Sequence, residues 1–351
     1  MVVYLPQGGG YRHRHERETR AGIAQRLAAL KGYAFSGEYD PGKSCARPLY
    51  FAPGDTLVGQ EAAALGIATE HDLFGGIVPH AFVATKVISH PLVDRGATAP
   101  LGWTHAFAER VGDAVLSGFS VFSREDARVA GRRLLEHGPA RVKPVHETGG
   151  RGQTVVATPA ELDAVVAALD EDELARDGLV IEEDLTDVTT YSVGLVRVAD
   201  LVASYHGTQA LTRANDGMQV YGGSRLEAVR GGFDALLALD LDDDTRLAVT
   251  QARTYDAAAS ELFSGLFASR RNYDIARGRN ARGEWRCGVL EQSWRIGGAS
   301  GAEIGALEAF RAAPSSPASG PPRSRSTAPM HPLPRRARRC TFAEPTSASV
   351  R

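Results

Sequence analysis

A glycine-rich segment between two expected strands constrains this chain more than any other feature. Residues 149–152 read Gly-Gly-Arg-Gly; Lys143 lies in the strand expected over 140–144, and another strand is expected over 154–157. Closely spaced glycines let backbone N–H groups approach phosphate oxygens, and a lysine adds positive charge for the same phosphates. Because a strand follows and no Gly-Lys-Ser/Thr is present, the segment is neither a Walker A loop nor a dinucleotide-binding fingerprint. The alternative is an ordinary glycine-rich hairpin loop.

Strand-like and helix-like patterns alternate along the first 311 residues. Apolar residues recur at helical spacing over 19–30, 124–135 and 245–263, with short apolar runs between them. Residues 158–161, Thr-Pro-Ala-Glu, have the pattern of a helix N-terminus with a capping box. The mixture predicts an α/β (α+β) fold. Further strands are expected over 48–52, 178–183, 272–277 and 286–296, and a hairpin over 190–203.

The composition is that of a soluble globular protein. The chain has 351 residues, 43% of them hydrophobic, and a net charge of −2 at pH 7, and its length suggests two or three domains. The near-neutral charge argues against a nucleic-acid partner, and no apolar run approaches the roughly 20 residues of a membrane span. The cysteines, Cys45, Cys287 and Cys340, have no disulfide or metal-ligand spacing. We therefore expect a cytoplasmic protein.

The C-terminal segment differs from the rest of the chain. Residues 312–351 hold eight of the 18 prolines, seven serines, seven arginines and one acid, and show no hydrophobic periodicity. Such a segment buries too little apolar surface to offset the entropy lost on ordering. We expect a disordered tail with a net charge of +6 attached to an acidic body.

Polar side chains recur at every second position of the strand expected over 286–296. On a strand, Glu291, Ser293 and Arg295 lie on one face. The preceding strand adds Asp274, which shares a site with Glu291 if the two strands pair. Magnesium beside phosphate needs only one or two carboxylates. The pattern indicates a magnesium–phosphate site, and the alternative is an edge strand whose charges face solvent.

Two other features accompany these acids. Lysine occurs only at positions 31, 43, 86 and 143, so nearly all basic residues are arginine. The apolar strand expected over 178–183 runs into Glu182-Glu183-Asp184-Leu185. This segment is either a strand that ends in a turn or a hinge whose backbone groups contact the edge of an adenine ring.

In their order along the chain, these segments resemble the ATP-grasp superfamily, the fold of carboxylate–amine ligases such as D-alanine–D-alanine ligase and of biotin carboxylase. The resemblance covers roughly residues 45–311. Within the superfamily, the chain is most similar to an uncharacterised bacterial ATP-grasp-like family of unknown function. The resemblance implies a small α/β N-terminal domain over 1–80 and an ATP-grasp domain over 81–311. In the latter, two α+β subdomains would clasp ATP, one of them a lid at about 138–185.

The resemblance also assigns nucleotide-binding roles. The family's two phosphate-contacting lysines correspond to Lys86 and Lys143. Its flexible glycine loop, which folds over the triphosphate, corresponds to Gly149, Gly150, Arg151, Gly152 and Gln153. Its adenine hinge corresponds to Glu182, Glu183 and Leu185, with backbone groups of the last two facing the base.

The metal-binding acids of the family correspond to Asp274 and Glu291, and Arg295 corresponds to an arginine near the transferred phosphate. There are two departures. Ser293 stands where the family has a metal-binding asparagine, and its hydroxyl can ligate magnesium from a shorter side chain. The acid that contacts the ribose is missing, and its region holds Asp187, Thr189 and Thr190.

The implied reaction is ligation that uses ATP and one or two Mg²⁺ ions. A substrate carboxylate would attack the γ-phosphorus, with Lys143 and Arg295 stabilising charge, and an amine would capture the acyl phosphate. The partners would be small-molecule carboxylates and amines, and a homodimer is among the open oligomeric states. A non-catalytic ATP-binding module, favoured by Ser293, and a small-molecule kinase on the same fold are the alternatives.

Arginines and histidines give weaker signals. Four arginines are candidates for clamping an anionic substrate, although an ordinary surface position is the better explanation for any one of them: Arg225, Arg230, Arg270 and Arg271. Histidines such as His90 show no metal-ligand spacing, and we assign none of them a role.

Overall fold

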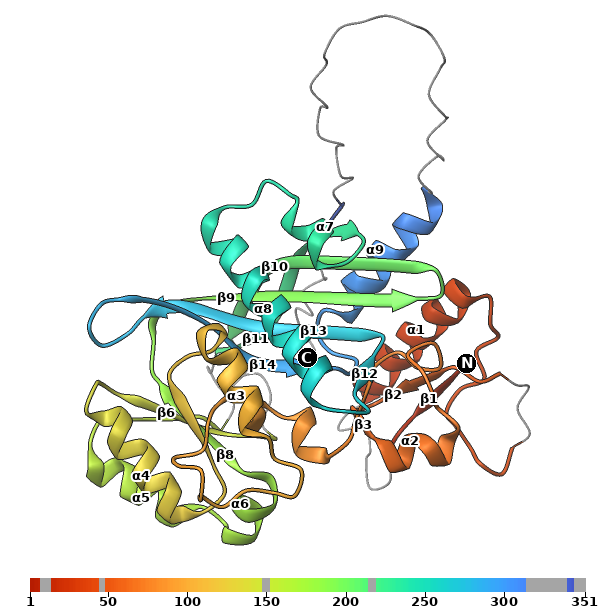
Figure 1. The fold of residues 1–351 in the computed structure, drawn as a ribbon. Helices are drawn as coiled ribbons and strands as arrows, with labels where there is room; N and C mark the ends of the chain where they lie inside the picture. The colour runs from red at the N-terminus through yellow and green to blue at the C-terminus, as the bar shows by residue number, and fades with distance from the viewer. Residues whose placement is uncertain (7–13, 44–47, 147–151, 214–218, 314–339, 344–351) are drawn as a thin grey trace, which may run out of the picture.

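The computed structural model describes residues 1–6, 14–43, 48–146, 152–213, 219–313 and 340–343. In these ranges the chain forms four β-sheets and the helices around them (Figure 1). This mixed α/β architecture confirms the fold class expected from the sequence pattern. No helix in the described ranges is long and apolar enough to cross a membrane.

The N-terminal part contains a parallel pair of strands, β1 (Val2–Tyr4) and β2 (Phe51–Pro53), beside helix α1 (Arg14–Lys31). A second small sheet, in the order β12-β4-β3, ties this part to the rest of the molecule, because β12 (Phe267–Ala268) comes from far along the chain. The other elements up to the next unit are β3 (Leu57–Val58), α2 (Gly59–Leu65), β4 (Gly76–Val78), η1 (Ala81–Ala84), η2 (Lys86–Ser89), α3 (His105–Val111) and η3 (Gly112–Ala114).

A six-stranded antiparallel sheet, in the order β14-β13-β9-β10-β11-β15, forms the centre of the molecule (Figure 1). Its strands are β9 (Thr186–Val198), β10 (Leu201–Arg213), β11 (Gln219–Arg230), β13 (Arg270–Arg279), β14 (Trp285–Ser293) and β15 (Cys340–Ala343). Helices α7 (Phe233–Leu237) and α8 (Asp243–Leu262) cover one face. On the other face, α9 (Ser300–Ala312) and α1 pack against β9 and β10.

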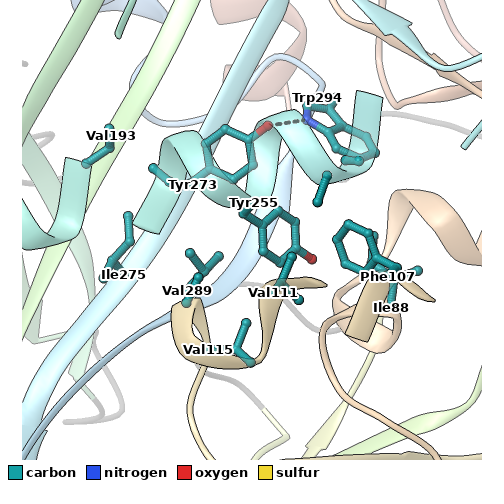
Figure 2. Close-up of a cluster of buried hydrophobic side chains, with 14 of the residues drawn as sticks. Ile88, Phe107, Val111, Val115, Val193, Tyr255, Tyr273, Ile275, Val289 and Trp294 are labelled. Carbon is teal, nitrogen blue, oxygen red and sulfur yellow. Dashed lines mark hydrogen bonds between the residues drawn. The ribbon is translucent and has the colours of Figure 1, made fainter. Parts of the chain in front are cut away.

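Alternation along β13 separates a core face from a polar face. Tyr273 and Ile275 point into the core, where the ring of Tyr273 lies 5.6 Å from that of Tyr255 of α8, centroid to centroid (Figure 2). Trp294 closes this cluster and donates its indole N–H to the Tyr273 hydroxyl at 3.3 Å (Figure 2). Because side chains alternate along a strand, the intervening Asp274 faces the opposite side of the sheet.

A separate four-stranded antiparallel sheet has the order β5-β8-β6-β7. Its strands are β5 (Gly118–Val121), β6 (Ala140–Pro144), β7 (Thr154–Val156) and β8 (Leu179–Glu183), and its helices are α4 (Arg124–Leu135), α5 (Pro159–Ala168) and α6 (Glu171–Asp177). The predicted capping box of Thr158 and Glu161 is present at the start of α5. We call residues 118–183 the four-stranded unit. It begins upstream of the predicted lid boundary at 138, because β5 pairs with β8.

The prediction of a disordered tail over 312–351 is wrong for Ala312, the last residue of α9, and for the four residues of β15. This strand pairs with β11, from Arg225 opposite Ala343 to Ala228 opposite Cys340. The edge of a sheet presents unpaired main-chain N–H and C=O groups, so an extended segment can join it without any hydrophobic periodicity of its own. The tail residues 314–339 and 344–351 lie outside the described residues.

Candidate functional site

A cleft of about 670 Å³ lies between the four-stranded unit and the polar face of the large sheet. Strands β6 and β8 contribute residues from one side, and β9, β13 and β14 contribute them from the other. The cleft brings together candidates that are far apart in the sequence: Lys86, Lys143, Glu182, Glu183, Leu185, Asp274, Glu291, Ser293 and Arg295.

Asp274 and Glu291 are direct partners across β13 and β14. A β-bulge at Leu290 produces this pairing, because the next residue of β13, Ile275, pairs with Val289. In a regular strand without the bulge, Glu291 would lie on the same side as the core residue Val289, since residues two apart share a face. The bulge therefore turns Glu291 toward the cleft.

The acid pair is electrostatically suited to a cation. Burial and the Glu291 carboxylate raise the pKa of Asp274 to about 6, although hydrogen bonds from Gln209 and Asn272 favour its charged form. In the described part of the chain, no three His, Cys, Asp or Glu side chains gather to hold a metal by themselves. Two carboxylates and the Ser293 hydroxyl nevertheless fit a magnesium ion that takes its other ligands from phosphate and water.

Lys86 is buried at the start of η2, and its Nζ lies 2.8 Å from Glu291 Oε2. The strand that carries Glu291 also holds the segment that carries Lys86. Gln292 Nε2 donates to the carbonyls of Thr85, at 2.7 Å, and Val83, at 3.0 Å. Since Gln292 follows Glu291 directly, β14 both carries the acid and anchors the segment that carries Lys86.

Lys143 forms a buried group with Glu182 and His90. Its Nζ donates to Glu182 Oε1 at 2.9 Å, and His90 Nε2 lies 3.3 Å from Glu182 Oε2. Burial by itself raises the pKa of Glu182, but Lys143 and His90 outweigh it and lower this pKa to about 2. No role could be assigned to His90 from the sequence, because a single histidine has no spacing that reveals its partner.

This group predicts a specific loss of stability in acid. The pKa of Glu182 is lower in the folded chain than its ordinary value of 4.5, so the ionised carboxylate stabilises the fold above about pH 4.5. That contribution is lost as the pH falls from 4.5 toward 2. Urea denaturation of the wild type and of Glu182→Gln across this range measures it. We expect the wild type to lose more unfolding free energy than the variant, and parallel pH profiles would contradict the buried ion pair.

Backbone amides of the predicted hinge differ in their partners. Glu183 N–H donates to Ser117 O at 2.8 Å, and Asp184 N–H donates to Pro139 O at 3.0 Å. Leu185 lines the cleft, and its N–H donates to no residue within the described ranges. Within the described ranges, the N–H of Glu183 therefore has a backbone partner and that of Leu185 has none.

The glycine loop is described only at its end. Gly149, Gly150 and Arg151 lie outside the described residues. Gly152 has a φ of 68°, in the left-handed region that glycine adopts most readily. The next residue, Gln153, lines the cleft. The described end of the predicted phosphate loop therefore reaches the cleft at Gln153.

Arg295 also lines the cleft, and its Nε lies 3.6 Å from Oδ1 of Asp55 in the N-terminal part. Of the four arginines considered for an anion clamp, Arg270 lines the cleft as well, but Glu303 neutralises it at 2.9 Å. Arg271 pairs with Asp256, and Arg230 donates to the carbonyl of Phe310; neither partner lines the cleft. Arg225 is exposed on β11.

Sequence reasoning missed several buried polar residues behind the acid pair: Tyr205, Asn272 and Glu303. Asn272 lies two residues from Asp274 and therefore on the same face of β13, a relation that can be predicted from the sequence. Glu303 is an acid on a buried face of α9 that is otherwise largely apolar, and such a residue usually has a buried partner. The identity of that partner depends on the tertiary structure.

A family of related sequences covers most of the chain. Its profile, described as "Protein of unknown function (DUF3182)", matches residues 3–319. The chain belongs to this family. The DUF3182 match spans the N-terminal part, the four-stranded unit and the strands of the large sheet other than β15. It confirms the expected resemblance to an uncharacterised family. A comparison with curated proteins finds no match.

Among solved structures, ATP-grasp ligases share the DUF3182 fold. D-alanyl-alanine synthetase A from Vibrio cholerae O1 biovar eltor is similar over 84% of this chain and 88% of that chain, with a TM-score of 0.51 and 12% identity. N5-carboxyaminoimidazole synthetase from Staphylococcus aureus is similar over 84% of this chain and 70% of that chain, with a TM-score of 0.45 and 11% identity. The ADP complex of PurK, N5-carboxyaminoimidazole ribonucleotide synthetase, is similar over 55% of this chain and 43% of that chain, with a TM-score of 0.34 and 14% identity. This chain therefore spans less than half of that one. The similarity to the D-alanyl-alanine synthetase confirms the ATP-grasp fold.

Proposed function

We propose that this protein is an ATP- and Mg²⁺-dependent ligase that joins a small-molecule carboxylate to an amine or similar nucleophile in the cytoplasm. One observation carries the proposal. Two carboxylates, Asp274 and Glu291, and two of the chain's few lysines, Lys86 and Lys143, line a single cleft in an ATP-grasp fold. Opposite charges gathered in this way suit a polyphosphate with its cation.

The nucleotide would lie along the cleft from the hinge to the acid pair. The N–H of Leu185, which has no partner among the described residues, suits an acceptor nitrogen on the adenine edge. Lys143 and Lys86, both buried, supply positive charge to the phosphates. Because each lysine is ion-paired with a carboxylate, to Glu182 and Glu291 respectively, nucleotide binding would exchange or share these partners.

Asp274, Glu291 and Ser293 would hold magnesium, which when bound neutralises phosphate charge. A carboxylate oxygen of the substrate attacks the γ-phosphorus, the bond to the bridging oxygen breaks, and ADP leaves with the electron pair. Arg295 and Lys143 stabilise the charge that develops. The amine nitrogen then attacks the acyl carbon, phosphate leaves, and the nitrogen loses a proton to solvent.

Product analysis tests this function against its alternatives. Purified protein is incubated with Mg-ATP and a panel of amino acids, and ADP and new products are measured. ADP release with a joined product is the expected result. A phosphorylated but unjoined product would instead establish a small-molecule kinase, and nucleotide binding without turnover would establish a non-catalytic module, which Ser293 favours.

A further inference from the structure

A buried polar network runs behind the acid pair, from helix α9 to Asp274. Glu303 of α9 is buried and pairs with Arg270, with Nη2 and Oε1 2.9 Å apart. The Tyr205 hydroxyl contacts the Glu303 carboxylate and lies 2.8 Å from Asn272 Oδ1. Asn272 Nδ2 in turn donates to Asp274 Oδ1 at 3.0 Å. Asn272 therefore connects this network to one of the proposed metal-binding acids.

The neighbours of Asn272 determine the orientation of its amide. The amide nitrogen of Asn272 faces Asp274, to whose Oδ1 it donates. Oδ1 then faces two hydroxyls, and Ser192 Oγ donates to it at 2.7 Å. The Tyr205 hydroxyl has a single proton, which either Glu303 or Asn272 can accept, but Ser192 satisfies the amide oxygen in both cases. The side chain of Asn272 is thus held in one orientation.

The same network holds the second acidic strand. Arg270 Nη1 donates to the carbonyls of Ser293, at 3.0 Å, and Arg295, at 2.5 Å. These bonds fix the end of β14, just after Glu291. Buried charge-assisted hydrogen bonds have a well-defined geometry, so α9, β13 and β14 are held in one arrangement around the acid pair.

We propose that Asn272 is a positioning residue of the cation site, which fixes the rotation of the Asp274 carboxylate toward Glu291. Asn272 and Ser293 are direct cross-strand partners, two positions along the hairpin from the pair of Asp274 and Glu291 and on the same face of the sheet. The amide missing at position 293 is thus present one strand away, where it acts through Asp274. This inference rests on the proposed function, because it assigns Asp274 and Glu291 to a divalent cation.

Cation affinity tests the inference without any need for a known substrate. Mn²⁺ is titrated into the full-length protein saturated with ADP, and bound Mn²⁺ is measured by electron paramagnetic resonance. We expect Asn272→Ala to weaken Mn²⁺ binding about 10-fold, the lower end of what supporting residues of metal sites contribute. The matched control is Asn280→Ala, in the turn between β13 and β14, which should leave Mn²⁺ affinity unchanged. ADP affinity in EDTA should be the same for all variants.

A milder variant covers the case in which Asn272→Ala does not fold. Ser192→Ala removes only the hydroxyl that donates to Asn272, and we expect it to weaken Mn²⁺ binding about threefold. Unchanged Mn²⁺ affinity in the folded variants overturns the positioning role and leaves the proposed function intact. If the wild type binds ADP but no Mn²⁺, the metal assignment itself is wrong, and the role of Asn272 is rejected with it.

Discussion

Substitution of Glu291 by glutamine is expected to reduce magnesium-dependent ADP release about 100-fold or more. The change removes one of the two carboxylates that face each other across β13 and β14. A bound cation contributes several kcal/mol to stabilising charge on a transferred phosphate, and each 1.4 kcal/mol corresponds to about a factor of ten in rate. Lys86 and Lys143 remain, so nucleotide affinity in the absence of metal should change much less.

The matched control is Glu284→Gln. Glu284 lies in the exposed turn of the same β13–β14 hairpin, where it accepts a hydrogen bond from Asn280. This variant should release ADP at the wild-type rate. Steady-state kinetics over a series of Mg²⁺ concentrations compare the two variants. Wild-type turnover by Glu291→Gln would show that the cation is held elsewhere.

Replacing Lys143 by methionine is expected to lower the free energy of unfolding by about 3 to 5 kcal/mol, because it leaves the buried Glu182 carboxylate without its main partner. Lys143 and Glu182 are 3% and 2% exposed, so water cannot replace the lost contact. The double variant Lys143→Met/Glu182→Gln should recover much of the loss, since it also removes the buried charge. Urea denaturation at pH 7 measures all three proteins.

Lys43→Met provides the control for this substitution. Lys43 is 76% exposed and lies 3.4 Å from Asp40, and exposed ion pairs of this kind contribute about 1 kcal/mol at most. Its stability should therefore remain close to that of the wild type. Equal stabilities for Lys143→Met and Lys43→Met would mean that Glu182 is not held as a buried anion.

Local patterns predicted much of the candidate site. Glu291, Ser293 and Arg295 were placed together because side chains alternate along a strand, and all three line the cleft. The scarcity of lysine drew attention to Lys86 and Lys143, which both line it as well. These signals depend on neighbouring residues or on composition, and they can be read without knowing which strands meet.

Other parts of the site could not be read locally. His90 is 92 residues from Glu182, and Glu303 is 33 residues from Arg270, so no motif spacing connects either pair. Burial makes both contacts necessary, because a charge removed from water needs a partner, but the sequence does not say which one. Strand β15 likewise depends on the free edge of β11 and not on its own composition.

Consecutive residues are enough to predict the strand and helix pattern, the residues that share a face, and the short motifs that are candidates for phosphate and metal binding. The folded chain is needed to learn which faces oppose each other across the cleft, and where the β-bulge at Leu290 turns Glu291 away from the core. This difference arises because alternation is a property of a few consecutive backbone dihedral angles. Strand pairing, bulges and buried ion pairs instead arise from the competition of all segments for the same core and the same hydrogen-bonding partners.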